Sequence, residues 1–394
     1  MPIINRIAEF QAEMTEWRRD LHAHPELSMQ EFRTSALVQE KLRAFGVDEI
    51  ITGMAETGVV GVIHGRPGSD RAVGLRADMD ALPLQEETGV PHASQTPGVM
   101  HACGHDGHTT MLLGAAKYLA ETRNFDGTVY LIFQPAEEFE AGGDKMVKDG
   151  LFSRCPMEMV FGLHNWPGSP EGRFLWRSGP IMAAVAFFDI TITGRGSHGA
   201  FPHQGIDPVV VSAQIINALQ TIVSRTIEPI EGGVVSVGSI NGGDAYNILP
   251  ERVTMKGTAR WFNPRVGDQI EAGMHRIVHG IAESLGAKAE LSFFRHAPAT
   301  VNDPEATTRA VRAAMAIGGE SQVREMPAPT MGGEDFAYML NAKQGAYIML
   351  GSGTGKDTPQ LHHPKYDFND EVLSVGASYW ATLAEQFLAR DGNG

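Results

Sequence analysis

The sequence is poor in cysteine and has no long apolar run. Its 394 residues include two cysteines, Cys103 and Cys155, so no disulfide framework is expected. No run of about 18 apolar residues occurs, so no membrane-spanning helix is expected, and the first ten residues do not resemble a signal peptide. We therefore expect a cytoplasmic protein, in which Cys103 is available as a thiol.

Basic residues are also scarce. Lysine and arginine total 32 against 47 acidic residues, which gives a formal net charge of −15. This balance argues against nucleic acid or an anionic membrane surface as the partner.

The chain is too long for one ordinary hydrophobic core, so two domains are expected. In its first part, short apolar segments at Val59–Ile63, Ala72–Ala77 and Thr128–Phe133 alternate with helical patterns. Strands that alternate with helices indicate an α/β domain with a mixed, largely parallel sheet flanked by helices.

The middle of the chain has a different order of elements. Between residues 183 and 297 the pattern is β-α-β-β-α-β, the ferredoxin-like arrangement. Asp207-Pro208 and Asn263-Pro264 each begin a helix, as N-cap and first-turn proline. We expect 183–297 to be an α+β domain inserted into a first domain that is formed by residues 1–182 and 298–394.

Four potential metal ligands lie within eight residues: His101, Cys103, His105 and His108. They follow a strand and precede a helix expected at about His108–Ala120. Thiolate and imidazole are ligands of borderline metals such as zinc, cobalt and nickel, whereas manganese prefers thiolate least. A buried thiol beside surface histidines is the alternative, but four such residues so close together favour a metal site.

Two adjacent carboxylates, Glu137 and Glu138, follow the strand Thr128–Phe133 in the segment Gln134-Pro135-Ala136-Glu137-Glu138. The carboxyl ends of strands are where α/β folds bind ligands. One carboxylate can bind a metal while its neighbour acts as a general base. By itself, this segment is equally compatible with a solvated acidic turn.

Other candidates carry weaker signals. His164 ends another apolar strand and His362 lies far downstream, and a lone histidine is more often structural than a ligand. Asp78 and Asp80 follow the strand Ala72–Ala77. In one interpretation, one of these aspartates orients a ligand histidine. In the other, both aspartates only cap a turn.

The inserted domain contributes three further candidates. His198 lies in a glycine-rich loop, Gly-Arg-Gly-Ser-His198-Gly, that is suited to present it to an oxyanion or a substrate carboxylate. Asn247 and Arg260 are polar residues near strand ends. Taken singly, each is more typical of a surface residue.

Together these segments resemble a known family. In chain order they are Trp17-Arg-Arg-Asp-Leu-His22-Ala-His24-Pro25-Glu26, His101-Ala-Cys103-Gly-His105-Asp106, Gln134-Pro-Ala-Glu137-Glu138, Gly162-Leu-His164-Asn-Trp, Gly-Arg-Gly-Ser-His198 and Leu-His362-His-Pro. They resemble the aminoacylase/carboxypeptidase family of two-metal metallopeptidases, and within it the hippurate hydrolase and indole-acetyl-amino-acid hydrolase group. The similarity covers nearly the whole chain.

The resemblance implies a catalytic domain and an inserted lid that also dimerises, in a homodimer or homotetramer. It implies two divalent ions (manganese, zinc, cobalt or nickel). The ligands implied are Cys103, His105, Glu138, His164 and His362. Glu137 is the implied general base. We expect Asp80 to orient a ligand without binding metal, and the resemblance implies that His198 reaches the active site of a neighbouring subunit.

The implied reaction is hydrolysis of an N-acyl amino acid, such as hippurate or an N-acetyl amino acid, to a carboxylic acid and a free amino acid. Metal-activated water attacks the amide, Glu137 transfers the proton, and His198 helps to stabilise the oxyanion. Asn247 and Arg260 are expected to hold the substrate carboxylate. The alternatives are a dipeptidase or carboxypeptidase with the same site, and a non-catalytic metal-binding protein, against which the presence of Glu137 argues.

Overall fold

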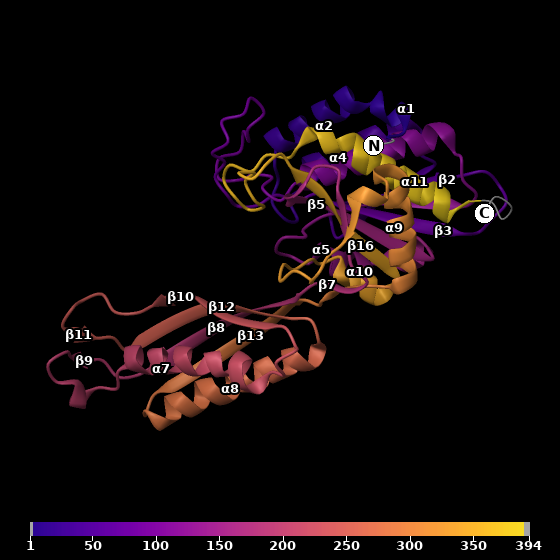
Figure 1. Ribbon diagram of the computed structural model, residues 1–394. Helices are drawn as coiled ribbons and strands as arrows, with labels where there is room; N and C mark the ends of the chain where they lie inside the picture. Colours follow the sequence, from indigo (N-terminus) through magenta and orange to yellow (C-terminus); the bar gives the residue numbers. More distant parts are fainter. Residues whose placement is uncertain (1–2, 390–394) are drawn as a thin grey trace. The chain divides into compact units, whose positions relative to one another are not determined.

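A computed structural model describes residues 3–389 of the chain (Figure 1). Residues 3–181, 300–329 and 335–389 form a first compact unit, and residues 182–299 and 330–334 form a second. Each unit has its own sheet and its own hydrophobic core.

The first unit contains an eight-stranded mixed sheet in the order β1-β2-β4-β3-β5-β16-β6-β15. The strands are β1 (Glu49–Met54), β2 (Gly58–His64), β3 (Ala72–Asp78), β4 (Thr128–Gln134), β5 (Met159–Pro170), β6 (Phe174–Trp176), β15 (Val323–Glu325) and β16 (Gly345–Gly353). The central strands β4, β3, β5 and β16 are parallel to one another. Strand β2 pairs antiparallel with both β1 and β4, and β6 pairs antiparallel with β16. All seven residues of β3 are buried, as in parallel sheets that are covered on both faces. The predicted α/β class with a largely parallel sheet is confirmed.

Helices of the first unit pack on this sheet and on one another. They are α1 (Asn5–Ala8), α2 (Gln11–Ala23), α3 (Phe32–Phe45), α4 (His105–Thr122), α5 (Gly142–Lys148), α6 (Leu151–Arg154), α9 (Pro304–Gly318), α10 (Ala337–Ala342) and α11 (Leu373–Phe387). Helix α4 packs against α2, α3, α11 and β3, and α9 packs against α11 and β16. Among the described helices, none is long and apolar enough to cross a membrane.

Helix α4 begins three residues earlier than the sequence pattern indicated. The expected start was His108, but the helix begins at His105, because Gly104 takes a left-handed conformation (φ 91°) immediately before it. His105 is therefore on the first turn of a buried helix. This start fixes its direction relative to the ends of the neighbouring strands.

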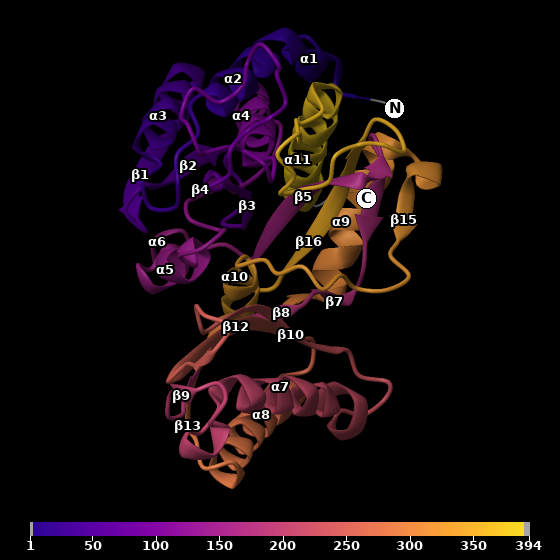
Figure 2. The same ribbon diagram turned by 90° about the vertical axis from the view of Figure 1, so that its left-hand side faces the viewer.

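The second unit has the order β8 (Ala184–Thr193), α7 (Pro208–Thr221), β10 (Gly233–Asn241), β12 (Arg252–Trp261), α8 (Pro264–Ser284) and β13 (Lys288–Ala297). Its antiparallel sheet has the order β10-β12-β8-β13, and α7 and α8 lie on one face of it (Figure 2). This strand order is that of the predicted ferredoxin-like arrangement. As expected, the side chains of Asp207 and Asn263 cap α7 and α8 by accepting backbone N–H groups of their first turns.

A buried ionic cluster joins α2 to the start of α4. Nδ1 of His22 lies 2.8 Å from Oδ2 of Asp106, and Nη1 of Arg18 lies 3.6 Å from the same oxygen. On the other side of the ring, Nε2 of His22 lies 3.4 Å from Oε1 of Glu86. Burial alone would lower the pKa of His22, but the hydrogen bonds to Asp106 and Glu86 raise it to about 9. Since Asp106 follows His105, this cluster anchors the first turn of α4.

Protonated His22 should stabilise the first unit in a pH-dependent way. A histidine whose pKa is raised from 6.5 to about 9 on folding stabilises fully below pH 6.5, and this stabilisation is lost as the pH rises through 9. The loss amounts to about 3 kcal/mol of the free energy of unfolding. Urea unfolding of chelator-treated protein should therefore show a gap between wild type and His22→Gln that shrinks from pH 6 to pH 9.5.

His24→Gln, immediately after the same helix and outside the cluster, is the matched control. A gap between wild type and His22→Gln that stays constant over this pH range would contradict the assignment of a charged His22.

Candidate metal centre

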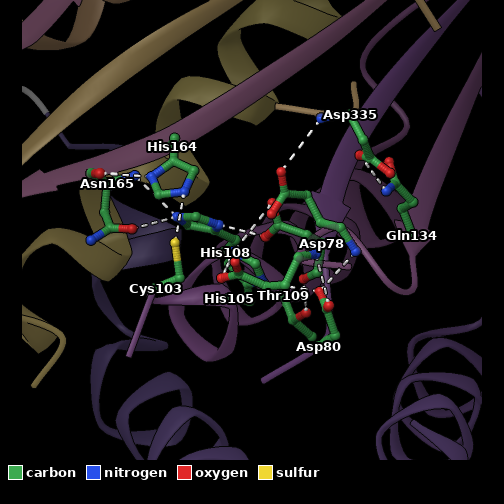
Figure 3. A network of polar contacts seen from close by, with 12 residues as sticks. Asp78, Asp80, Cys103, His105, His108, Thr109, Gln134, His164, Asn165 and Asp335 are labelled. Atoms are coloured by element: carbon green, nitrogen blue, oxygen red, sulfur yellow. Dashed lines mark hydrogen bonds and ion pairs between the residues drawn. The ribbon is translucent and has the colours of Figure 1, made fainter. Parts of the chain in front are cut away.

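The site lies at the carboxyl edge of the central parallel strands (Figure 3). Asp78 ends β3 and is paired in register with Gln134, the last residue of β4. Strand β5 lies on the other side of β3 and contributes His164. Parallel strands bring their carboxyl ends to one edge of a sheet, where ligands bind in α/β folds. Residues that lie tens of positions apart in the sequence therefore meet here.

The five residues predicted as metal ligands come together at this edge. Sγ of Cys103 lies 3.4 Å from Nε2 of His164, and ligand atoms of these two residues and His105 all lie within 4.8 Å of one another. Oε1 of Glu138 lies 3.9 Å from Nε2 of His105 and 3.5 Å from Nε2 of His362. His362 is half-exposed and Cys103, His105 and His164 are buried, so the cluster reaches from the core of the unit to its surface.

In His105 and His164, the two buried histidines predicted as ligands, hydrogen bonds hold Nδ1 and direct Nε2 towards the other predicted ligands. Nδ1 of His105 lies 3.2 Å from Oδ1 of Asp80, and Nδ1 of His164 lies 2.8 Å from the carbonyl oxygen of Asn165. A ring that donates through Nδ1 has its lone pair on Nε2, the arrangement usual for a metal-binding histidine.

Two buried polar atoms in the cluster have no hydrogen-bond partner among the described residues: Nε2 of His105 and Oε1 of Glu138. Buried polar atoms are rarely left unsatisfied, and these two face each other across 3.9 Å. A cation that binds both would satisfy them, and the thiol of Cys103 and the ring of His164 add donors of the type that borderline metals prefer. The donor set therefore fits a metal site.

The electrostatics of the cluster also favour a cation. Burial raises the pKa of the Cys103 thiol well above its usual value, and the carboxylates of Glu138 and Glu137 raise it further. Burial disfavours the charged form of His105, but Asp78 and Asp80 outweigh burial and raise its pKa to about 10. Protons on these groups balance the surrounding carboxylates, and a bound metal ion would release them and take over that role.

Asp80 contacts two of the predicted ligands, His105 and Glu138, and binds neither through the atom that faces the cluster. Its Oδ1 accepts the backbone N–H of Glu137 at 3.1 Å as well as the His105 contact, and its Oδ2 accepts the N–H of Glu138 at 3.0 Å and the hydroxyl of Ser28 at 2.7 Å. The aspartate thus touches His105 through the ring nitrogen opposite the free one. It also fixes the loop that carries the two glutamates.

Gly104 allows the close approach of Cys103 and His105 to β5. Its φ of 91° lies in the region that favours glycine, and a Cβ added here would lie 2.5 Å from Oδ1 of Asn165 and 2.7 Å from the hydroxyl of Tyr366. Any other residue would push the start of α4 away from the strand that carries His164.

Asp78 and His108 were only open candidates in the sequence, and their contact with each other was not predicted. Oδ1 of Asp78 lies 2.6 Å from Nδ1 of His108, whose Nε2 lies 2.7 Å from Oδ1 of Asn165. Burial opposes ionisation of Asp78, yet the charges of His105, His108 and Arg76 hold its pKa well below its usual value. Their positions, directly after the strand Ala72–Ala77 and one turn after His105, were the available signals.

His101 does not join the ligand cluster. Both of its ring nitrogens are buried without a hydrogen-bond partner among the described residues, and burial lowers its pKa to about 4. It belongs to none of the groups of described residues whose donor atoms lie close enough to hold one ion. Of the four residues His101, Cys103, His105 and His108, only Cys103 and His105 have donor atoms grouped with those of Glu138 and His164 among the described residues, whereas His108 is grouped with Asp78 and His105.

The remaining predicted residues belong to the second unit. His198 is exposed on β9 (Ser197–His198), which pairs with β11 (Ile248–Leu249), and its Nδ1 accepts the N–H of Ala200 at 3.1 Å, so the ring proton is on Nε2. Asn247 lies next to it, since its carbonyl oxygen accepts the N–H of Gly199 at 2.7 Å.

Arg260 lies near the far end of β12, in the four-stranded sheet and not in the β9–β11 pair. It is eight residues beyond Arg252, where β12 begins, and strand geometry puts about 26 Å between those two positions. Its guanidinium lies over the ring of Phe187, 5.9 Å from the centroid, and burial lowers its pKa. The structure therefore brings His198 and Asn247 together and separates Arg260 from them within one chain.

Comparisons with known proteins identify the family of the chain. Residues 74–386 match the profile of the family described as peptidase family M20/M25/M40. The chain is 41% identical over 388 residues to hippurate hydrolase of Campylobacter jejuni, covering 98% of this chain and 100% of that protein. It is 40% identical over 399 residues to thermostable carboxypeptidase 1 of Saccharolobus solfataricus, covering 98% and 99%.

Among solved structures, a dinuclear metal binding peptidase of the M20 family from Bacillus subtilis is similar over 97% of this chain and 99% of that one, with a TM-score of 0.82 and 36% identity. The family profile matches most of the chain, and each of these relatives matches over nearly its full length. The chain therefore belongs to peptidase family M20/M25/M40.

Proposed function

We propose that the protein is a metal-dependent amidohydrolase that cleaves N-acyl amino acids into a carboxylic acid and a free amino acid. The observation that carries this proposal is that Nε2 of His105 and Oε1 of Glu138, both buried and without a hydrogen bond among the described residues, converge beside a second carboxylate, Glu137. The relative named hippurate hydrolase, similar over its whole length, supports this substrate class.

We propose two divalent ions, held by Cys103, His105, Glu138, His164 and His362. The M20 relative described as dinuclear supports the number of ions. One thiolate and three imidazoles favour zinc, cobalt or nickel. Of the four candidate metals, manganese binds thiolate least readily. We also propose a cytoplasmic location, where a thiol ligand stays reduced.

The proposed chemistry divides between the metals and the chain. When bound, the metal ions supply Lewis acidity that makes water nucleophilic near neutral pH. Glu137 accepts the proton as water attacks the amide carbon, and it delivers that proton to the nitrogen as the C–N bond breaks. Its backbone N–H is fixed by Asp80 at 3.1 Å, so the carboxylate starts from a defined position.

The second unit would supply oxyanion and substrate contacts. His198 carries its proton on the exposed Nε2, which suits it to donate to an oxyanion. We propose that it does so in the site of a neighbouring subunit, which makes a homodimer the smallest complete assembly and gives the second unit its lid and dimerisation role. Asn247 lies five residues before β12 begins at Arg252, whereas Arg260 lies about 26 Å from Arg252 along that strand. If both bind one substrate carboxylate, they come from different subunits.

A dipeptidase or carboxypeptidase with the same site is the second candidate, and the relative named thermostable carboxypeptidase favours it. Hydrolysis rates for hippurate, N-acetyl amino acids and dipeptides, with each of the four metals supplied in turn, separate the two. We expect the N-acyl amino acids to be cleaved fastest. Absence of hydrolysis for every substrate and metal would favour a metal-binding protein without catalysis.

Replacing Glu137 with glutamine should lower kcat by about 10²–10⁴-fold, the usual contribution of a general base, while metal content stays at the wild-type level. Glu140→Gln is the matched control, because Glu140 is an exposed neighbour paired with Lys145. Near-normal turnover of Glu137→Gln would remove Glu137 from the proposed mechanism.

Replacing Cys103 with alanine should remove at least one equivalent of metal after dialysis, together with activity, because the remaining donors lose their only thiolate. Elemental analysis of the dialysed protein measures this. Cys155→Ala, at the other buried free cysteine, should keep its metal. Unchanged metal content in Cys103→Ala would exclude Cys103 as a ligand.

A further inference from the structure

Glu31 is a fully buried carboxylate that the proposed mechanism does not use. Its Oε1 accepts the backbone N–H groups of Ala136 at 2.9 Å and Met29 at 3.1 Å. Its Oε2 accepts the hydroxyl of Thr57 at 2.7 Å. A buried carboxylate is unfavourable unless its oxygens are hydrogen-bonded, and here three donors from three separate segments are directed at one side chain.

Glu31 does not serve the helix that it precedes. It is the residue immediately before α3, but its side chain makes no capping hydrogen bond. That function belongs to Glu26, whose carboxylate accepts the N–H groups of Arg33 at 3.0 Å and Thr34 at 2.8 Å. The carboxylate of Glu31 is instead directed to Ala136, 105 positions away in the sequence.

Ala136 has an unusual backbone conformation. Its φ is 55°, in the left-handed region that a residue other than glycine adopts only when its surroundings hold it there. Glu31 binds its N–H, and its carbonyl oxygen accepts the N–H of Gly142 at 3.0 Å. The next two residues are Glu137 and Glu138, so the conformation of Ala136 sets the direction in which both carboxylates leave the sheet edge.

Two buried carboxylates together bind three successive N–H groups of this loop. Glu31 accepts that of Ala136, and Asp80 accepts those of Glu137 and Glu138. Both acceptors are supported by one short segment near the N-terminus, since Ser28 donates to Asp80. We propose that Glu31 is a positioning residue, which holds Ala136 in its left-handed conformation and thereby places Glu137 and Glu138 at the metal centre.

This inference rests on the proposed function for the roles of the two glutamates, although the contacts of Glu31 stand independently of it. Burial raises the pKa of Glu31 to about 7, although the hydrogen bond from Thr57 lowers it. A proton on Oε2 can be donated to the hydroxyl of Thr57 while Oε1 still accepts from Ala136. The contact with Ala136 therefore persists in both protonation states.

This geometry makes glutamine a conservative replacement. Its Oε1 can accept from Ala136 and Met29, and its amide N–H can be donated to Thr57. Glu31→Ala removes the acceptor altogether, and Glu31→Met removes it while keeping the side-chain volume. Glu26→Ala is the matched control, because it removes an acceptor of two backbone N–H groups from the same segment without touching the loop 135–138.

The experiment compares these variants in two measurements: kcat and KM for the best substrate of the panel, and Co²⁺ affinity by competition with a chromogenic chelator. For Glu31→Ala we expect kcat to fall by about 10- to 100-fold with little change in KM, since misplacing a reacting group by about 1 Å costs about 10²-fold. We also expect weaker Co²⁺ binding, because Glu138 is displaced. In Glu31→Gln, kcat and Co²⁺ affinity should both stay within about threefold of the wild-type values. In Glu26→Ala, kcat should stay at the wild-type value.

Wild-type kcat and Co²⁺ affinity in Glu31→Ala would overturn the proposal, as would an equal loss in Glu26→Ala or in Glu31→Gln. If the cavity left by alanine prevents folding, Glu31→Met makes the same test. If the wild type hydrolyses no N-acyl amino acid, the proposed function fails, but Co²⁺ affinity still shows whether Glu31 positions Glu138.

Discussion

The site depends on one buried aspartate and the donors that surround it. The carboxylate of Asp80 binds a ring N–H on the first turn of α4, two backbone N–H groups of the loop after β4, and the hydroxyl of Ser28. An ionised carboxyl group in a protein interior is stable only with such compensation. These hydrogen bonds join four segments of the chain: that of Asp80, the start of α4, the loop after β4 and the segment of Ser28. They thereby help to position the predicted metal ligands and the proposed base.

A second set of buried charges fixes the strand ends beside Asp80. The guanidinium of Arg76 is completely buried and binds Asp78 at 2.7 Å, Gln134 at 2.8 Å and Asp335 at 3.1 Å. Because an arginine fork is planar and binds several acceptors in fixed directions, the ends of β3 and β4 and the segment before α10 are held in one arrangement. The edge of the sheet that presents the ligands is therefore a rigid support.

Local patterns in the sequence were sufficient for much of this. The apolar strands, the β-α-β-β-α-β order, and the spacing of Cys103, His105, Glu137 and Glu138 each reflect a few neighbouring residues, and the fold class followed from them. Contacts between distant segments were not accessible in that way. Nothing near Glu31 in the sequence points to Ala136, and the separation of Asn247 from Arg260 depends on where β12 runs in the sheet. The start of α4 was misplaced because neither the left-handed conformation of Gly104 nor its close approach to Asn165 and Tyr366 of other segments is visible in the local sequence.

The division of the first unit into separate chain segments has a consequence for the order of folding during synthesis. Strand β16, which lies beside β5 near the middle of the sheet, and α11, which packs on α4, both come from the last 50 residues described. The four-stranded sheet and the helices α7 and α8 of the second unit come from one continuous stretch, 184–297. Domains generally fold as units as they emerge from the ribosome. The second unit can therefore complete its core while the first still lacks β16 and His362, so the metal centre is among the last parts of the molecule to form.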